Sequence, residues 1–151
     1  MITFDTNVLF YALDRRSPEK QAVAQDLIGR ALDRPGTVVL SMQVLGELYF
    51  SLTRKKVVSR EDALRTVRLH MDVFDLIPGT RAGFAKALDA VRDHDLPLWD
   101  AVLWADVDAF GCRLLLTEDF QDGRVLGGVR ILNPFNPDNR VPLDAALPPV
   151  E

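Results

Sequence analysis

The stretch LLLTEDFQDG, residues 114–123, joins a run of leucines to a dense group of acids. Three leucines followed by Thr117 are typical of a short buried strand. Three carboxylates then fall within five positions, at Glu118, Asp119 and Asp122. Like charges held a few ångströms apart repel one another, so this placement indicates either a solvated turn before Gly123 or a site that binds a cation.

Short apolar runs of the same kind recur along the rest of the chain, at residues 2–4, 37–40, 74–77 and 129–132. Between them, apolar residues at helical spacing predict helices at residues 8–13, 18–34, 42–52, 60–71, 81–92 and 98–110. Residues suited to cap these helices stand at Ser17, Ser41, Ser59 and Thr80. Short strands that alternate with helices predict an α/β fold with a mainly parallel sheet.

The C-terminal segment differs in composition from the rest of the chain. Five of the nine prolines lie from Pro134 onward, and proline favours extended backbone. We expect this segment to lie extended over the surface or to hang free. The expected organisation is one domain, residues 1–135, followed by a proline-rich tail, residues 136–151.

The charges are unevenly distributed along the chain. The formal net charge is -4, which argues against binding nucleic acid by bulk attraction. Residues 1–70 carry 11 Lys and Arg against 8 Asp and Glu, a balance of +3, whereas residues 71–151 carry 7 against 14, a balance of -7. The asymmetry is explained either by solvated helix faces, which charge alone favours, or by a basic rim beside an acidic centre.

The sequence also indicates the cellular compartment of the protein. The single cysteine, Cys112, forms no internal disulfide. The N-terminus lacks a basic segment followed by a long apolar run, and no window approaches the length of a membrane span. We therefore expect a cytoplasmic protein without a membrane segment.

Four acids are expected at one edge of the sheet, because ligands of parallel α/β proteins gather outside the carboxyl ends of the strands. Asp5 ends the first strand and Asp119 follows the fourth. Glu47 is the only charge in MQVLGELYFSL, and Asp100 stands in the first turn of the helix in PLWDAVLWA. Taken singly, Asp5 is equally suited to cap a helix, and for Asp100 an interaction with the helix dipole is the stronger interpretation. For Glu47 the structural interpretation, a pair with Arg54 or Arg68, is the weakest of the set.

Together the four acids favour a divalent cation, because their mutual repulsion would otherwise be several kcal/mol. Oxygen ligands select Mg²⁺ or Mn²⁺ over zinc. The only histidines, His70 and His94, lie in polar contexts at helix ends. The sequence shows no Ser-His-Asp set and no glycine-rich phosphate loop.

Four segments together resemble the PIN domain family, and within it the VapC-like toxins of bacterial toxin–antitoxin pairs. They are ITFDTNVLFYAL (2–13), VVLSMQVLGEL (38–48), PLWDAVLWADVDAFGCRLLLTEDFQDG (97–123) and GVRILNPF (128–135). The resemblance covers roughly Met1 to Phe135. It implies a three-layer α/β/α sandwich with a central, mainly parallel sheet, and it makes residues 1–135 a PIN-like nuclease domain.

The resemblance also implies roles for individual residues. It makes Asp5, Glu47, Asp100 and Asp119 the acidic quartet around Mg²⁺ or Mn²⁺, with Asp5 and Asp100 as the most direct ligands. Glu47 would hold a second ion or a water, and Asp119 would complete the shell. Asn7 and Thr117 match the supporting polar positions. Asp122 is either a further acid of the site or a turn residue before Gly123, and we favour the turn.

The implied activity is metal-dependent hydrolysis of RNA phosphodiester bonds by an endoribonuclease, giving 5′-phosphate and 3′-hydroxyl ends. For a toxin of a VapBC-type pair the family further implies a homodimer and a cognate antitoxin protein that blocks the site. The charge asymmetry, in turn, suggests that the RNA backbone is held by basic residues of the first half, Arg15, Arg16, Arg54, Lys55 and Lys56.

Three alternatives remain at this stage. A housekeeping RNA-processing PIN nuclease would have the same residues. A PIN-like scaffold without activity would not need the intact quartet. A phosphoacceptor receiver-like signalling module would need an acidic pair after the first strand, an Asp after the third and a late lysine, whereas Pro78-Gly79 follows the third strand and no lysine follows Lys86.

Overall fold

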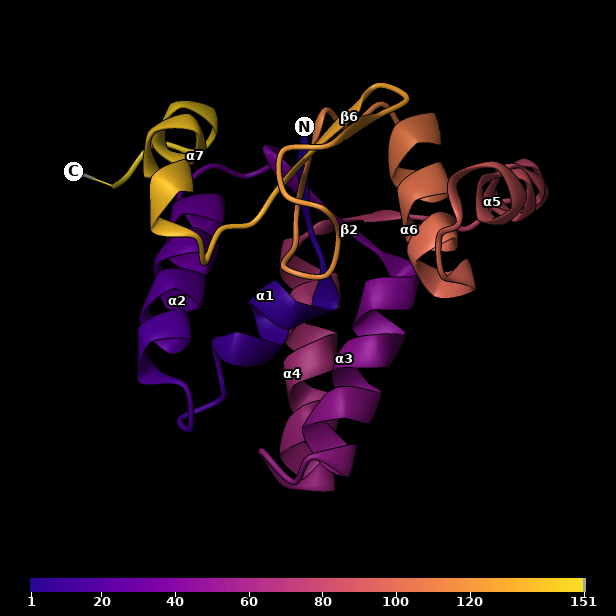
Figure 1. The fold of residues 1–151 in the computed structure, drawn as a ribbon. Coiled ribbons are helices and arrows are strands. Elements are labelled where there is room, and N and C mark those ends of the chain that lie inside the picture. Colours follow the sequence, from indigo (N-terminus) through magenta and orange to yellow (C-terminus); the bar gives the residue numbers. More distant parts are fainter. Residues whose placement is uncertain (151) are drawn as a thin grey trace.

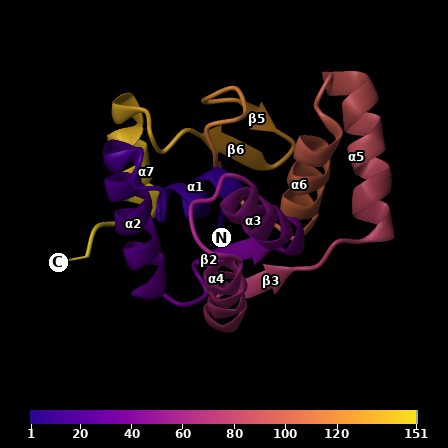
Figure 2. The same cartoon turned by 90° about the horizontal axis from the view of Figure 1, so that it is seen from below.

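A six-stranded sheet forms the centre of the molecule (Figures 1 and 2), which we describe over residues 1–150 from a computed structural model. Its strands are β1 (Ile2–Phe4), β2 (Val38–Ser41), β3 (Asp75–Ile77), β4 (Leu114–Leu116), β5 (Val125–Leu126) and β6 (Val129–Leu132). The strand order is β3-β2-β1-β4-β6-β5. All neighbours pair in parallel except β5 and β6, so the mainly parallel sheet is confirmed.

The strands are short and almost wholly apolar because helices cover both faces of the sheet. Every residue of β1, β2 and β4 is buried. Even Thr3, in the middle of β1, has no exposed surface. The central strand pair is β1 and β4, with Ile2 opposite Leu114 and Phe4 opposite Leu116.

The helices are α1 (Thr6–Tyr11), α2 (Pro18–Leu32), α3 (Met42–Arg54), α4 (Arg60–Val73), α5 (Arg81–His94), α6 (Leu98–Ala109) and α7 (Arg140–Ala146), with a 3₁₀ turn η1 (Pro137–Asn139). In Figure 1, α2 and α7 lie at one end of the molecule and α5 and α6 at the other. α3 packs against α1 and α4, and α6 packs against α5 and the sheet. The arrangement is the expected three-layer α/β/α sandwich.

The capping residues expected from the sequence behave as predicted in all but one helix. Ser41, Ser59 and Thr80 each accept a backbone N–H of the first turn that follows, which satisfies donors that a helix leaves free. Ser17 stands at the N-cap of α2, but its side chain makes no capping hydrogen bond. Pro18 in the first turn of α2 removes one of the donors that a cap would satisfy.

The prediction of an extended or free C-terminal segment is wrong. The segment forms η1 and α7, and the side chains of Leu143 and Leu147 are 4% and 0% exposed. Arg30 of α2 fixes it with hydrogen bonds to Asp144 (2.6 Å) and to the carbonyl of Leu147 (2.8 Å). A basic residue on a helix of the first half therefore holds the end of the chain.

Two further features complete the fold. The two-residue strand β5 was not predicted; it forms a hairpin with β6 through the Gly127-Gly128 turn. Cys112 is buried and free, as expected. Within residues 1–150, no helix has the length and apolar character needed to cross a membrane.

Candidate active site

The site is built where β1 and β4 end side by side. Asp5 and Thr117 directly follow the two strands, and the backbone N–H of Asp5 donates to the carbonyl of Leu116 at 2.9 Å. The hydroxyl of Thr117 donates to Asp5 Oδ2 at 2.6 Å, while Asp5 Oδ1 accepts the backbone N–H of Thr6 at 2.6 Å. Asp5 is thus the N-cap of α1 and also faces the site.

Asn7 connects the first strand's acid to the loop after β4. Its amide nitrogen lies 3.4 Å from Asp5 Oδ2, 3.2 Å from Thr117 Oγ1 and 3.1 Å from Asp119 Oδ2. The backbone N–H of Asp119 also donates to Thr117 Oγ1, at 3.1 Å. Asn7 and Thr117 therefore fix the positions of the two acids, as supporting residues would.

Glu47 of α3 is held by two residues that the sequence did not single out. Its Oε2 accepts the Thr6 hydroxyl at 3.1 Å, and its Oε1 accepts the amide of Gln43 at 2.6 Å. The same Gln43 amide donates to the carbonyl of Trp99 at 2.9 Å, next to Asp100 at the start of α6. Gln43 stands four positions before Glu47 on one helix, a spacing from which the contact could have been predicted.

A cavity of about 190 Å³ brings the four predicted acids together. Its lining residues are Asp5, Thr6, Asn7, Phe10, Tyr11, Glu47, Ser51, Lys55, Asp100, Glu118 and Asp119. The acids come from the ends of two strands and from two helices. We call this cavity the acid pocket.

The electrostatics of the acid pocket oppose the charged form of two of its acids. Burial raises the pKa of Asp5 to about 7, and the charges of Asp119 and Glu47 add to the increase, against the hydrogen bonds from Thr117 and Thr6. Burial, followed by the same two charges, raises the pKa of Asp100 to about 6. The charges of Asp119 and Glu47 therefore lie close enough to disfavour ionisation of Asp5 and Asp100.

Within the described part of the chain, no basic side chain forms an ion pair with the four acids. Over residues 1–150, Asp5, Glu47, Asp100 and Asp119 make no ion pair within 4.0 Å. The fifth acid of the pocket, Glu118, is paired with Lys20 at 2.5 Å, and Lys20 also lies 4.5 Å from the centre of the Tyr11 ring. The pairs with arginine that would have explained Glu47 as a structural residue are therefore not formed.

The donor set fits a hard divalent cation. The pocket presents carboxylate oxygens, and the side-chain oxygen of Asn7 is buried without a hydrogen-bond partner among the described residues. Within residues 1–150, no three acidic, histidine or cysteine side chains form a ready-made metal cluster. Mg²⁺ keeps several waters and is held by one or two carboxylates, so acids spaced around an open cavity suit it better than a closed cage would.

Asp122 lies outside the acid pocket. Its carboxylate accepts the backbone N–H of Asn133 at 2.8 Å and the side-chain amides of Asn136 and Asn139, both at 2.9 Å. These bonds tie the turn after Asp119 to the start of the C-terminal segment, in agreement with the interpretation of Asp122 as a turn residue.

The five basic residues predicted to bind RNA are divided by the structure. Arg15, Arg16 and Lys56 line a second cavity of about 660 Å³, which we call the basic cavity. Lys55 lines the acid pocket. Arg54 lies over the Phe50 ring, 5.8 Å from its centre, and lines neither cavity.

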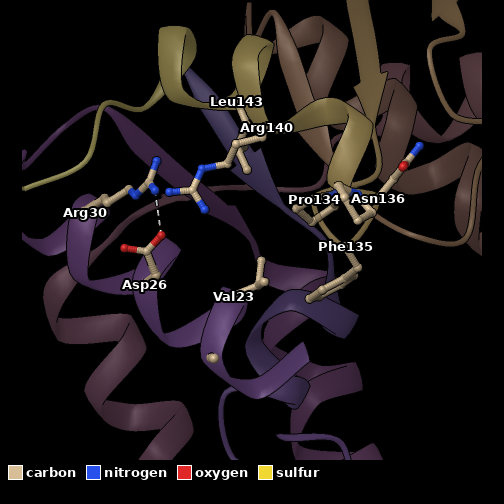
Figure 3. Close-up of a pocket in the computed structure, with 10 residues that line it drawn as sticks. Val23, Asp26, Arg30, Pro134, Phe135, Asn136, Arg140 and Leu143 are labelled. Carbon is tan, nitrogen blue, oxygen red and sulfur yellow. Dashed lines mark ion pairs between the residues drawn. The ribbon is translucent and has the colours of Figure 1, made fainter. Parts of the chain in front are cut away.

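A third cavity, of about 510 Å³, lies between α2 and the C-terminal segment (Figure 3). Val23, Phe135 and Leu143 form much of its apolar wall. Asp26 is the one acid in its lining, and it is paired with Arg30 at 2.6 Å. This cavity therefore offers no group of acids comparable with the acid pocket.

Fold and site together define the class of this protein: a mainly parallel α/β/α sandwich with an acidic pocket at the carboxyl edge of its sheet. A family model of the PIN domain matches residues 2–122. The chain belongs to the PIN domain family, as the sequence motifs indicated, and the receiver-like alternative is thereby set aside.

Solved structures with the same fold include toxins of toxin–antitoxin pairs. VapC20 of Mycobacterium tuberculosis, described as a toxin that cleaves the sarcin-ricin loop, superposes with a TM-score of 0.64 at 21% identity, over 79% of this chain and 90% of its own. A toxin–antitoxin complex from Klebsiella pneumoniae superposes with a TM-score of 0.63 at 19% sequence identity, and the match covers 89% of this chain and 98% of the other. VapBC2 of Rickettsia felis, bound to a DNA fragment from its promoter, superposes with a TM-score of 0.62 at 15% sequence identity, and the match covers 88% of this chain and 98% of the other. No curated protein sequence matches the chain significantly.

Proposed function

We propose that this protein is a metal-dependent endoribonuclease that hydrolyses RNA phosphodiester bonds, and that it is the toxin of a VapBC-type toxin–antitoxin pair. One observation carries the proposal: four carboxylates from separate elements line one pocket, and none of them makes an ion pair within residues 1–150. Four such acids are a cost to stability unless a cation binds among them.

In this proposal Asp5 and Asp100 are the direct ligands of Mg²⁺ or Mn²⁺, Glu47 holds a second ion or a water, and Asp119 completes the shell. When bound, the ion activates a water, neutralises the scissile phosphate and stabilises the leaving oxygen. The site thus needs no protein nucleophile. This agrees with the lining of the pocket, which among residues 1–150 includes one serine, Ser51, and no histidine or cysteine.

Polar residues in and beside the pocket hold the acids in place. The hydroxyl of Thr117 donates to one oxygen of Asp5, and this hydrogen bond fixes the orientation of the carboxylate in the site. Asn7 holds Asp119, and Gln43 holds Glu47 against the start of α6. Lys55, on the rim, supplies a positive charge toward which a phosphate of the RNA is attracted.

The toxin assignment is supported by the fold neighbours, which are VapC proteins or toxin–antitoxin complexes. An apolar groove of about 350 Å³ lies between α3 and α4 and is lined by Met42, Leu45, Tyr49, Leu64 and Val67 among others. We assign this groove to an amphipathic segment of the antitoxin.

We propose that a second copy of the chain packs on the outer face of α5, where the apolar residues Phe84 and Leu88 are 43% and 51% exposed. We place the homodimer in the cytoplasm. Residues 136–151 are assigned to a C-terminal extension of the nuclease domain.

The test is cleavage of a mixed pool of structured RNAs with Mg²⁺, with Mn²⁺ and with EDTA. We expect cleavage that requires the metal, is lost in the Asp5→Ala/Asp100→Ala variant and leaves 5′-phosphate ends. The matched control is Asp72→Ala/Asp138→Ala, which removes the same charge from exposed positions. Cleavage that persists in EDTA, or that survives in the first variant, would contradict the proposal.

A further inference from the structure

The acid pocket and the basic cavity adjoin each other along the chain. Tyr11 and Lys55 line the acid pocket, and the residues that follow them, Ala12 and Lys56, line the basic cavity. Both cavities are therefore bounded by the end of α1 and by the end of α3. A ligand that extends out of the acid pocket past Lys55 meets the basic cavity next.

The basic cavity carries an excess of positive charge. Its charged lining residues are Arg15, Arg16 and Lys56 against the single carboxylate of Asp14. Asp14 is buried and accepts the guanidinium of exposed Arg16 at 2.7 Å and 3.3 Å, which orients Arg16 at the cavity wall. Arg15 and Lys56 are exposed and make no ion pair within residues 1–150.

The wall of the basic cavity is fixed in place. Gln21 and Gln25 of α2 both donate their side-chain amides to the carbonyl of Ala12, at 3.2 Å and 2.9 Å. These bonds tie the segment after α1 to α2, and they hold the loop that bears Arg15 against a helix. The bonds order this part of the wall, which lowers the entropy lost on binding.

Lys56 occupies a position where glycine is favoured. It follows the C-cap Lys55 of α3 and has a φ of 53°, the left-handed conformation that usually ends a helix with glycine. A lysine in this conformation is less stable than glycine, because its Cβ approaches the following carbonyl. The backbone conformation therefore does not explain a lysine at this position.

We infer that the basic cavity binds phosphates of the RNA strand whose scissile bond lies in the acid pocket. The inference rests on the proposed nuclease function and assigns the path of its substrate. Arg15 and Lys56 contact the RNA backbone. Arg16 also contacts it, with its guanidinium oriented by the hydrogen bonds to Asp14. Lys55, which lines the acid pocket next to Lys56, contacts the strand between the two cavities. Backbone contacts are independent of sequence, so the subsite gives affinity and register, and the choice of target lies elsewhere.

The test uses binding in EDTA, so that cleavage does not interfere. The probe is a fluorescein-labelled single-stranded RNA of mixed sequence, and anisotropy gives the dissociation constant over a range of salt concentrations. The variant is Arg15→Gln/Lys56→Gly. The matched control is Arg81→Gln/Arg130→Gln, which removes two exposed charges from α5 and β6.

We expect the Arg15→Gln/Lys56→Gly variant to reduce the salt slope by about 1.4, because each phosphate contact on a single strand contributes roughly 0.7. At about 0.1 M salt this corresponds to an affinity loss on the order of 20-fold. The control should keep the slope and affinity of the natural chain. Lys56→Gly alone should not lower the melting temperature, which separates the binding loss from misfolding.

Three outcomes would overturn the inference: an unchanged slope in the variant, an equal loss in the control, or tighter binding of duplex DNA than of RNA. Failure of the nuclease proposal looks different. In that case Mg²⁺ would give no cleavage, while RNA binding would still depend on Arg15 and Lys56.

Discussion

Replacing Asp5 by asparagine should stabilise the metal-free protein at neutral and alkaline pH. Burial first, and then the charges of Asp119 and Glu47, raise the pKa of Asp5 from 3.8 to about 7. The folded state therefore holds a proton that the unfolded chain releases. Asparagine is uncharged and keeps an oxygen to accept the backbone N–H of Thr6.

The sign of the effect follows from proton binding. Below about pH 4 the carboxyl is protonated in both states, so Asp5 costs nothing there. Between about pH 4 and 7 the unfolded chain binds fewer protons than the folded one, so the free energy of unfolding falls as pH rises. At about 1.4 kcal/mol for each tenfold change in protonation, the loss reaches about 4 kcal/mol above pH 7.

Such a loss is a large share of the free energy of unfolding of a typical domain, which is about 5–15 kcal/mol. Urea unfolding in EDTA, at about pH 4, 6 and 8, measures it for the natural chain and for Asp5→Asn. We expect similar stabilities near pH 4 and a more stable variant near pH 8. Because burial and neighbouring charges also raise the pKa of Asp100 to about 6, some pH dependence should remain in the variant.

Two results would refute this reasoning. One is a variant that is less stable than the natural chain near pH 8, which would mean that the hydrogen bonds of the Asp5 carboxylate outweigh its burial. The other is an identical pH dependence in both proteins. Asp138→Asn, at an exposed position, controls for the change of net charge.

Three further outcomes are expected. Mg²⁺ at about 100 times its dissociation constant should raise the free energy of unfolding by about 2.7 kcal/mol, and calorimetry should show no such gain in Asp5→Asn/Asp100→Asn. Thr117→Val leaves Asp5 without its hydroxyl donor, so unfolding and RNA cleavage assays should show a loss of about 1–3 kcal/mol and lower activity. Arg30→Met should cost about 2 kcal/mol, since buried Arg30 loses its ion pairs with the partly exposed Asp26 and Asp144, and limited proteolysis should then cut the C-terminal segment first.

That these acids line one pocket was predictable from local signals in the sequence. Asp5 and Asp119 follow apolar strands, and the carboxyl ends of parallel strands meet at one edge whatever the details of packing. Glu47 is a lone charge among apolar neighbours. The partners of these acids were harder to find, since Thr6 and Gln43 are ordinary residues whose role arises only when α1, α3 and α6 are brought together.

The C-terminal segment was mispredicted for a related reason. Its prolines indicate extended backbone, but Pro142 lies within the first turn of α7, where proline is tolerated. Arg30 reads as a solvated residue of an amphipathic helix, yet its side chain is 1% exposed because a segment 114 residues later covers it. Contacts at that separation leave no periodic trace in either stretch.

Asp5 shows why the structural and the chemical interpretations of an acid need not compete. One oxygen caps α1 by accepting the N–H of Thr6, and the other accepts the hydroxyl of Thr117 inside the acid pocket. The cap explains why an acid is tolerated at the end of β1, but asparagine or serine would cap as well without the cost of a buried charge. What the cap leaves unexplained is the charge, placed near Glu47 and Asp119, which raise the pKa of Asp5 further. The cation of the proposed function would supply the missing reason, because it would reverse the sign of that electrostatic cost.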